Sequence, residues 1–549
     1  MKIALAQLNY HIGNFAANTS RIIASISEAK KEGAELIIFS ELAVCGYPPF
    51  DMLERKEFME KCQNAIDEIA PHCEGIAAIV GGPSINPEPK GKKLFNSAFF
   101  IQDGKVASVT AKTLLPNYDV FDEYRYFQPN NQFSVIDYKG IRLAITICED
   151  LWDEQSVANS FARDKLYTMS PMDELVRLNP DLVINMAASP FSHSQVDIRR
   201  SIVTKKAEKY HLPFIYVNQV GANTELIFDG NSMVVNNRGE VVLTMKAFEE
   251  ELQIVDSDEL MKMEPIVTER ERLHLIHDAL ILGVKDYFYK MGFTKATLGL
   301  SGGIDSAVTL VLAVKALGAD NVRVLMLPSK YSSDHSIKDA VELAENLKVQ
   351  YEVVPIKEIV AEFDNALNKL FTGLEADVTE ENIQARVRGT LLMALSNKFG
   401  HILLNTSNKS EAAVGYGTLY GDMNGGLSVL GDVYKTDVFK LARYINGEET
   451  IIPENTIVKP PSAELRPDQK DSDSLPDYEI LDDILYRYIE QNQSPDEMVA
   501  AGFDGHIVQK AVRLVNRNEY KRFQTPPVLR ISSKAFGIGR RMPLVALYT

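Results

Sequence analysis

Hydrophobic residues recur along the first half of the chain in short runs separated by one amphipathic stretch. The first run is followed by a helical pattern and then by an uninterrupted apolar run, which is the order strand, helix, strand. This order predicts that the first half folds as α/β layers. The predicted elements are strands over residues 2–8, 35–39, 106–111, 142–147, 182–186 and 214–217, a helix over 18–31 and a hairpin over 232–244.

The second half repeats a different unit, in which each apolar strand is followed by a loop and a helix. A helix is predicted from about residue 270 to 289, then strands over 297–300, 322–327 and 401–404. Helices are expected to 317 and, from a cap at Ser333 or Asp334, to 347. Regular alternation of this kind indicates a doubly wound parallel sheet.

The stretch between these halves, residues 256–272, is rich in charge and lacks strand alternation. A chain of 549 residues is also too long for one hydrophobic core. We therefore expect one domain over residues 1–256, a connection over 257–272 and a second domain over 273–549.

Composition excludes several classes of protein. The chain has 58 basic and 75 acidic side chains, and its net charge of −17 has the wrong sign for binding nucleic acid. No apolar window reaches the length of a membrane span, and the first residues do not form a signal peptide, so a cytoplasmic location is expected. The four cysteines lack the spacing of a zinc site or a disulfide framework.

Three chemically reactive side chains follow predicted strands of the first half, namely Glu41, Lys112 and Cys148. Each alone also fits a structural role. Strand carboxyl ends are where α/β folds place their sites, so the three could converge. Glu41 could then take the thiol proton and Cys148 attack an acyl carbon, while Lys112 and the backbone N–H of Glu149 stabilise the oxyanion. An adjacent cation is also expected to lower the thiol pKa.

The residues around these three side chains resemble the nitrilase, or carbon-nitrogen hydrolase, superfamily. The similar stretches are Phe-Ser-Glu-Leu-Ala-Val-Cys-Gly-Tyr, Ala-Lys-Thr-Leu-Leu-Pro-Asn-Tyr and Ile-Thr-Ile-Cys-Glu-Asp-Leu-Trp. The resemblance implies a four-layer αββα sandwich and amide hydrolysis through a thioester. For a glutaminase it implies that Tyr118, Glu123, Ser189 and position 195 hold glutamine. The family usually has Lys or Arg at that last position and this chain has Gln195, so Arg199 or Arg200 is the alternative cation for the substrate carboxylate.

The second half contains a glycine-rich turn between a strand and a helix, with the sequence Ser-Gly-Gly-Ile-Asp-Ser at 301–306. Gly302 and Gly303 can adopt backbone angles closed to other residues, so that N–H groups point at an anion on the helix N-terminus. The turn lacks the lysine of a Walker loop and has Asp305 instead, and an acid beside phosphates suggests a metal. It resembles the loop of ATP-pyrophosphatases, whose fold is adenine nucleotide α hydrolase-like.

Polar residues after the other strands complete a candidate nucleotide site. Asp305 and Glu411 follow different strands of one sheet, so they could share a Mg²⁺ ion with ATP phosphates. Phosphate donors could come from Thr406, Lys409, Arg386 and Lys435. Residues 454–478 are rich in Pro, Ser and acids and are predicted to form a loop that acts as a lid.

Together with Lys-Pro-Pro-Ser-Ala-Glu-Leu-Arg-Pro at 459–467, these features resemble the NAD synthetase family over residues 264–549. The resemblance implies that deamido-NAD is bound by Asn382, Glu411 and Lys521. It implies that Mg²⁺ is held by Asp305 and Glu411. The ATP contacts that it implies are Gly299, Leu300, Ser301, Gly302, Gly303, Ile304, Asp305, Ser306 and Thr406.

A glutaminase domain joined to such a domain implies a glutamine-dependent ligase of NAD biosynthesis. The implied reaction adenylates deamido-NAD, releases pyrophosphate and transfers ammonia from glutamine to give NAD and AMP. An enclosed path for ammonia and pairing of synthetase domains into a homo-oligomer are expected. Two alternatives remain: an adenylating amidotransferase with another carboxylate acceptor, and a nucleotide-sensing protein with relic sites.

Overall fold

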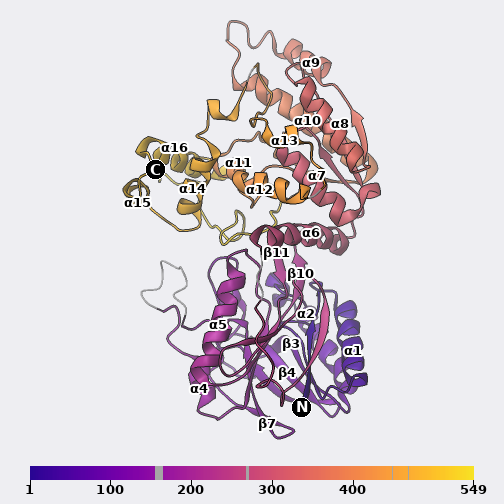
Figure 1. Cartoon of the computed structure of the whole chain (residues 1–549), viewed down its shortest axis with the longest axis vertical. Coiled ribbons are helices and arrows are strands. Elements are labelled where there is room, and N and C mark those ends of the chain that lie inside the picture. Colours follow the sequence, from indigo (N-terminus) through magenta and orange to yellow (C-terminus); the bar gives the residue numbers. More distant parts are fainter. Residues whose placement is uncertain (155–164, 268–270, 448, 468, 549) are drawn as a thin grey trace. The chain divides into compact units, whose positions relative to one another are not determined.

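The computed structural model describes residues 1–154, 165–267, 271–447, 449–467 and 469–548. The chain divides into two compact units, Met1–Arg270 and Glu271–Thr549, shown in Figure 1. The predicted connection, residues 257–272, includes 268–270, which lie outside the described residues. Within the described part of the chain, no helix is long and apolar enough to cross a membrane.

The first unit contains two six-stranded sheets of mixed direction. One sheet has the strand order β14 (Glu251–Asp256), β1 (Lys2–Gln7), β2 (Leu36–Ile38), β3 (Ala77–Ile85), β4 (Leu94–Gln102) and β5 (Lys105–Ala111). The other has the order β13 (Val241–Thr244), β12 (Met233–Val235), β9 (Phe214–Asn218), β8 (Leu182–Ala187), β7 (Ile141–Ile147) and β6 (Ile136–Tyr138). A separate hairpin pairs β10 (Val220–Asn223) with β11 (Leu226–Asp229).

Period-two alternation explains how these sheets pack. In β1, Ile3 and Leu5 face the second sheet, whereas Ala4 and Ala6 pack under helices. The outer helices are α1 (Phe15–Lys31) and α2 (Lys56–Ile69) on one side, and α4 (Pro171–Val176) and α5 (Gln195–Tyr210) on the other (Figure 1). Both faces of each sheet are therefore buried, which confirms the predicted αββα sandwich.

The second unit is built on a five-stranded, fully parallel sheet. Its order is β17 (Gln350–Val353), β16 (Val322–Met326), β15 (Ala296–Gly299), β18 (Ile402–Asn405) and β19 (Leu427–Ser428). The chain winds from β15 toward β17 and then returns to β18 on the other side of β15. The loops after β15 and β18 therefore meet at the topological switch point, where open α/β sheets bind ligands.

Helices cover this sheet, and some of them form a second hydrophobic core beside it. Those that follow or flank the strands are α6 (Arg272–Met291), α7 (Ile304–Leu317), α8 (Asp334–Asn346), α9 (Lys357–Leu367), α10 (Val378–Phe399), α11 (Lys409–Val414) and α12 (Lys435–Asn446). The remaining helices of this unit are α13 (Glu454–Val458), α14 (Tyr478–Ile489), α15 (Pro495–Ala500), α16 (Gly505–Arg517) and α17 (Glu519–Arg522). A separate hydrophobic cluster joins α11, α14, α15 and α16.

The hydrophobic pattern located most elements but missed several. The first helix begins at Phe15, before the predicted residue 18, because the Asn14 side chain caps it by accepting from the Ala17 N–H. Strands β3 and β4 were not predicted, since β3 contains Gly-Gly-Pro-Ser, which reads as a turn. The predicted loop at 454–478 contains α13 and a single turn of 3₁₀ helix at Asp471–Asp473.

Candidate functional site

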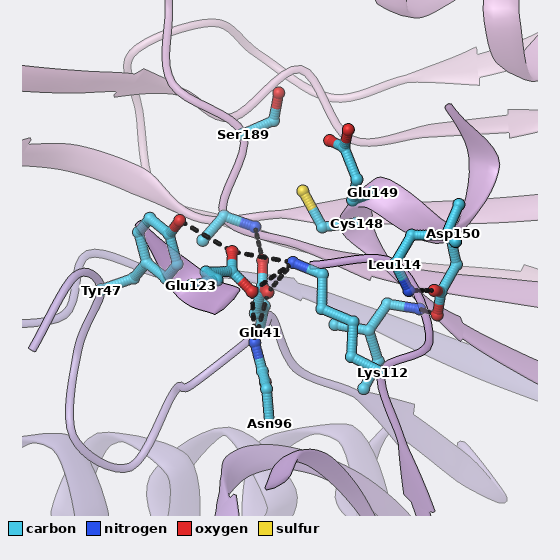
Figure 2. A network of polar contacts seen from close by, with 12 residues as sticks. Glu41, Tyr47, Asn96, Lys112, Leu114, Glu123, Cys148, Glu149, Asp150 and Ser189 are labelled. Atoms are coloured by element: carbon cyan, nitrogen blue, oxygen red, sulfur yellow. Dashed lines mark hydrogen bonds and ion pairs between the residues drawn. The ribbon is translucent and has the colours of Figure 1, made fainter. Parts of the chain in front are cut away.

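The first unit brings Glu41, Lys112 and Cys148 together from two different sheets. Glu41 follows β2 and Lys112 follows β5, both in the first sheet, whereas Cys148 follows β7 in the second. The Cys148 backbone has φ of +42°, in the left-handed region that non-glycine residues rarely adopt. This turn places the thiol above the polar cluster in Figure 2.

A buried ionic network lies beneath the thiol. The Lys112 ammonium is fully buried and donates to Glu41 Oε1 at 2.7 Å and to the two carboxylate oxygens of Glu123 at 2.9 and 2.8 Å. Glu123 lies at the start of α3 (Glu123–Tyr126) and also accepts from the Tyr47 hydroxyl at 2.9 Å. The second Glu41 oxygen accepts from the Ala188 N–H at 3.0 Å. Two acids therefore share one lysine in the absence of solvent.

Burial changes the charge state of this network. It raises the pKa of Glu123 to about 7, with a further upward effect of Glu41 and a downward effect of Lys112. Burial alone would lower the pKa of the Lys112 ammonium, but Glu123 and Glu41 reverse this and the net direction is upward. The lysine is therefore charged, while the Glu123 carboxyl can hold a proton near neutral pH.

The thiol itself departs from the sequence prediction. Burial, together with the Glu41 carboxylate, raises the pKa of the Cys148 thiol well above its usual range, although Lys112 acts in the opposite direction. Lys112 therefore lowers the thiol pKa as predicted, but burial and Glu41 outweigh it, so the net direction is upward. A neutral thiol needs a base during attack, and the neighbouring Glu41 carboxylate can serve as that base.

Asp150 connects the segment that carries Lys112 to the segment that carries Cys148. One of its oxygens accepts from the backbone N–H groups of Thr113 and Leu114, which follow Lys112, at 3.0 and 2.8 Å. The other accepts from the Ile147 N–H, which precedes Cys148, at 3.0 Å. These contacts appear in part in Figure 2 and fix the lysine segment against the cysteine turn.

Polar groups next to the thiol are candidate contacts for an amino-acid substrate. Glu149 is buried and accepts from the hydroxyls of Tyr118 and Tyr167 at 2.9 and 2.8 Å. Burial raises the pKa of Glu149 to about 7, while Lys112 and the two tyrosines lower it. Ser189 lies on the opposite side of the thiol from Glu149 in Figure 2. These residues offer an acid and hydroxyls to a zwitterionic substrate.

The two arginines considered as alternatives to Gln195 have other partners. The buried Arg199 guanidinium pairs with Asp229 and donates to the Ser189 carbonyl at 3.5 Å. Arg200 donates to the Ile266 carbonyl at 3.2 Å. Gln195 is the first residue of α5 and is half-buried. Arg199 therefore holds the Ser189 backbone in place, and Asp229 neutralises its charge.

The second unit has a cavity of about 580 Å³ at the switch point of its sheet. Gly302 has φ of +80°, and a Cβ there would lie 2.2 Å from the Ser336 carbonyl, so this position requires glycine. Gly303 has an ordinary φ of −79°, so the predicted need for unusual angles holds only at Gly302. The predicted ATP contacts that line the cavity are Gly299, Leu300, Ser301, Gly303, Ile304, Asp305, Ser306 and Thr406.

Lys435 lies between the two predicted metal ligands. Its ammonium pairs with Asp305 and lies 3.5 Å from Glu411 Oε1. Asn408 donates to Asp305 from its side chain at 2.9 Å and to Glu411 from its backbone at 3.3 Å. Burial and Asp305 raise the pKa of Glu411 to about 8, while Lys435 lowers it. The two carboxylates therefore face one cation position at the edge of the cavity.

This donor set can be compared with the requirements of Mg²⁺. Among the described residues, no three His, Cys, Asp or Glu side chains converge as a metal cage. Mg²⁺ in nucleotide sites is commonly held by one or two carboxylates together with phosphate oxygens. Asp305 and Glu411 fit that kind of site, in which phosphates complete the coordination.

Other predicted substrate contacts cluster on one segment. Asn382 accepts from the Thr418 hydroxyl at 2.7 Å, and the Lys521 ammonium donates to the Gly415 and Gly417 carbonyls at 2.8 Å each. Lys521 and Glu411 border a small second pocket, and Glu411 also lines the large cavity. Asn382 and Lys521 are thus brought to the same loop.

Two of the predicted phosphate donors have other contacts. The Lys409 ammonium is fully buried and contacts Glu490 at 2.8 Å and Asp432 at 2.9 Å. Arg386 donates to the Leu419 carbonyl at 3.2 Å. Lys409 therefore has a structural role, and the prediction that it binds phosphate is wrong.

Residues 459–466 and 469–471 form one wall of the cavity. Glu464 accepts from the hydroxyls of Ser333 and Ser336 at the start of α8, at 2.7 and 2.9 Å. Lys459 pairs with Asp339 of the same helix at 2.9 Å. Ser333 is the N-cap of α8, as predicted. The predicted lid is therefore attached to α8 by one carboxylate and one ammonium group.

Sequence reasoning missed several residues of these sites. Tyr47, Asn96 and Tyr167 contact the acids of the first site, and Arg388 and Glu464 line the cavity. Tyr47 ends the quoted stretch that contains Glu41, and Glu464 lies within the Pro-rich stretch singled out above, but no role was assigned to either. Asn96 and Tyr167 lie in stretches with no distinctive residue spacing.

Comparisons with known proteins agree with this arrangement. Residues 2–262 match the carbon-nitrogen hydrolase family, and residues 276–525 match NAD synthase. A glutamine-dependent NAD(+) synthetase of Synechocystis is 45% identical, covering 100% of this chain and 99% of that protein. One from Acinetobacter baylyi is 45% identical, covering 99% and 98%. The solved structure of the Acinetobacter baumannii enzyme in complex with ADP is 42% identical with a TM-score of 0.78, covering 100% of this chain and 99% of that one.

The two units therefore define an amidotransferase of the ligase class, in which an amide-hydrolysing unit is joined to a nucleotide-dependent synthase unit. More closely, the chain belongs to the glutamine-dependent NAD(+) synthetase family. Enzymes of this kind use ATP and act on small molecules.

Proposed function

We propose that the enzyme converts deamido-NAD to NAD through a nicotinoyl-adenylate, with glutamine as the nitrogen donor and AMP, pyrophosphate and glutamate as the other products. The observation that carries the proposal is that one chain holds both a buried cysteine, glutamate and lysine site and a phosphate-loop cavity. Residues 1–256 would then hydrolyse glutamine and residues 273–549 would form NAD, with 257–272 as the connection.

In the first unit, Glu41 accepts the Cys148 proton as the sulfur attacks the side-chain amide carbon of glutamine. Lys112 and the Glu149 N–H stabilise the oxyanion, and ammonia leaves with a proton returned by Glu41. Water then hydrolyses the thioester. Glu149, with Tyr118, matches the α-ammonium of glutamine, while Glu123 orients the lysine, and Ser189 and Gln195 border the bound amino acid.

In the second unit, the phosphate loop and Thr406 bind ATP, and the ADP complex of the Acinetobacter baumannii relative supports this. Asp305 and Glu411 would hold Mg²⁺ with the phosphates, where the ion neutralises charge on the leaving pyrophosphate. Lys435 donates to phosphate oxygens from between the two acids. Asn382 and Lys521 shape the loop against which deamido-NAD binds, with Glu411 at its boundary with ATP. A homo-oligomer formed through this unit is also proposed.

The test compares two nitrogen sources. Cys148→Ala is expected to abolish glutamine-driven NAD formation, by at least about 10³-fold, because it removes the nucleophile. Ammonia-driven formation should stay within about twofold of the wild-type enzyme. Cys73→Ala, which removes another buried thiol, is the matched control and should retain both activities. Equal loss of both activities in Cys148→Ala would contradict the assignment, and AMP release with an acceptor other than deamido-NAD would favour the other amidotransferase.

A further inference from the structure

Asn96 contacts all three polar members of the buried network. It lies on β4, where its backbone carbonyl accepts from the Lys112 N–H at 2.8 Å. Its side-chain amide donates to Glu41 Oε1 at 2.7 Å and to Glu123 Oε2 at 3.3 Å. The residue is 1% exposed, so water does not compete for these contacts. Figure 2 shows the amide directed at both carboxylates from the side opposite the thiol.

The orientation of this amide follows from charge. The Asn96 side-chain oxygen has no hydrogen-bond partner among the residues that the structure describes, whereas the nitrogen faces two carboxylates. A flipped amide would place its oxygen against both acids and leave them without this donor. The nitrogen therefore faces the acids, at the expense of an unpartnered acceptor.

Donors around the acids are divided between charged and neutral groups. Lys112 supplies one positive charge to two carboxylates, which leaves the buried cluster with one excess negative charge when both are ionised. The excess negative charge is stabilised by neutral donors. The Tyr47 hydroxyl donates to Glu123, the Ala188 N–H donates to Glu41, and the Asn96 amide donates to both. A donor to a carboxylate favours its ionised form.

We propose that Asn96 is a positioning residue of the amide-hydrolysing site, which holds the Glu41 carboxylate in place as the base by bridging it to Glu123. This inference rests on the catalytic assignment proposed above. Asn96 does not reach the reacting atoms in this role. It acts through Glu41, and by its backbone it also fixes the start of the lysine segment.

Titratable groups that face Glu41 come from several elements. They are Lys112 after β5, Glu123 of α3, Cys148 after β7 and Tyr47 on the loop after β2. The acid limb of the pH profile is therefore expected to follow Glu123, whose pKa burial raises to about 7 and which also accepts from Asn96. Loss of the Asn96 donor removes a group that favours ionisation, so this limb should move to higher pH.

The experiment measures glutamine hydrolysis by the full-length enzyme with Asn96→Ala, Asn96→Asp and Ser97→Ala. Ser97 is the matched control, because it is the next residue of the same strand, is equally buried and bonds to the Ser84 hydroxyl at 2.7 Å. Asn96→Ala is expected to lower kcat about 10- to 100-fold at neutral pH with KM changed less than about threefold. The acid limb should rise by about one pH unit, and raising the pH should recover part of the loss.

Asn96→Asp separates the effect of the hydrogen-bond donor from that of side-chain shape. The substitution preserves the side-chain volume, removes the amide donor and adds a third acid. It should shift the acid limb further upward than Asn96→Ala. An unshifted acid limb in both variants, with a loss equal to that of Ser97→Ala, would overturn the proposal. Where a variant folds poorly, the pH profile of glutamine hydrolysis by the surviving fraction still gives the position of the acid limb.

Failure of the catalytic assignment gives a different result. Glutamine-driven activity that survives in Cys148→Ala would contradict the site itself, whatever Asn96 does. If Cys148→Ala is inactive with glutamine and Asn96→Ala shows wild-type kcat and acid limb, the site stands and the bridging role of Asn96 is wrong.

Discussion

Removal of the Lys112 charge is the sharpest test of the buried network. Lys112→Met keeps the length of the side chain and leaves Glu41 and Glu123 without the cation that contacts them at 2.7 to 2.9 Å. Loss of one partner from a fully buried ion pair typically costs about 3–5 kcal/mol of unfolding free energy. For a unit of this size that corresponds to a fall in Tm of roughly 10 °C.

The loss should depend on pH in a defined direction. The pKa of Glu123 is already about 7 with the lysine present and would rise further without it, because Lys112 is the strongest of the groups that lower this pKa. At pH 6 the pair takes up a proton and the charge repulsion is relieved, so the loss should be smaller at pH 6 than at pH 8. Differential scanning calorimetry at both values measures this, with ATP used to identify the transition of the second unit.

A double variant isolates the ionic term. Lys112→Met with Glu123→Gln removes one acid together with the cation, so it should recover at least about half of the loss while glutamine-driven activity stays absent. Ammonia-driven synthesis should be retained in both proteins. A Lys112→Met enzyme within about 1 kcal/mol of wild type at pH 8, or a double variant no more stable than the single one, would refute the reasoning.

Three further predictions concern the other acids. Burial raises the pKa of Glu149 to about 7, so the wild-type protein loses unfolding free energy as pH rises from about 4.5 to 7. Glu149→Gln lacks this group, and its unfolding free energy should therefore gain up to ~3 kcal/mol relative to wild type over that window. Parallel curves of unfolding free energy against pH in substrate-free protein would contradict this. Asp305→Asn should lower the ammonia-driven rate at least about tenfold and raise the Mg²⁺ needed for half-maximal rate; an unchanged Mg²⁺ titration would exclude the metal role. Glu464→Gln should increase proteolytic cleavage within 459–471, and ATP with deamido-NAD should reduce it, whereas equal cleavage of both proteins would show that the bonds to α8 do not hold the segment.

Sequence pattern predicted the parts of the sites that coincide with strand ends. Glu41, Lys112 and Cys148 each follow a predicted strand, and the packing of two sheets brings these strand ends together. Asp305 and Glu411 follow β15 and β18 and meet because the carboxyl ends of parallel strands lie at one edge of their sheet.

Other features depend on packing that residue order does not reveal. Asn96 lies inside β4, a strand that was not predicted, and its role arises only because β5 pairs with that strand. The net direction of the thiol pKa was not predicted, because the cation was visible in the sequence and the degree of burial was not. Lys409 could not be distinguished from a phosphate donor until its contacts with Asp432 and Glu490 were known.

The origin of the three reactive groups in two separate sheets has a consequence for the newly made chain. Glu41 and Lys112 belong to the first sheet and Cys148 to the second, so neither sheet alone is a glutaminase. A chain that has formed its strands but has not yet packed the sheets together holds a thiol without a base. With the roles proposed above, such a chain would not hydrolyse glutamine during synthesis or partial unfolding, because hydrolysis requires the two sheets to be packed together. Glutamine turnover can then serve as a probe of that packing step in refolding experiments.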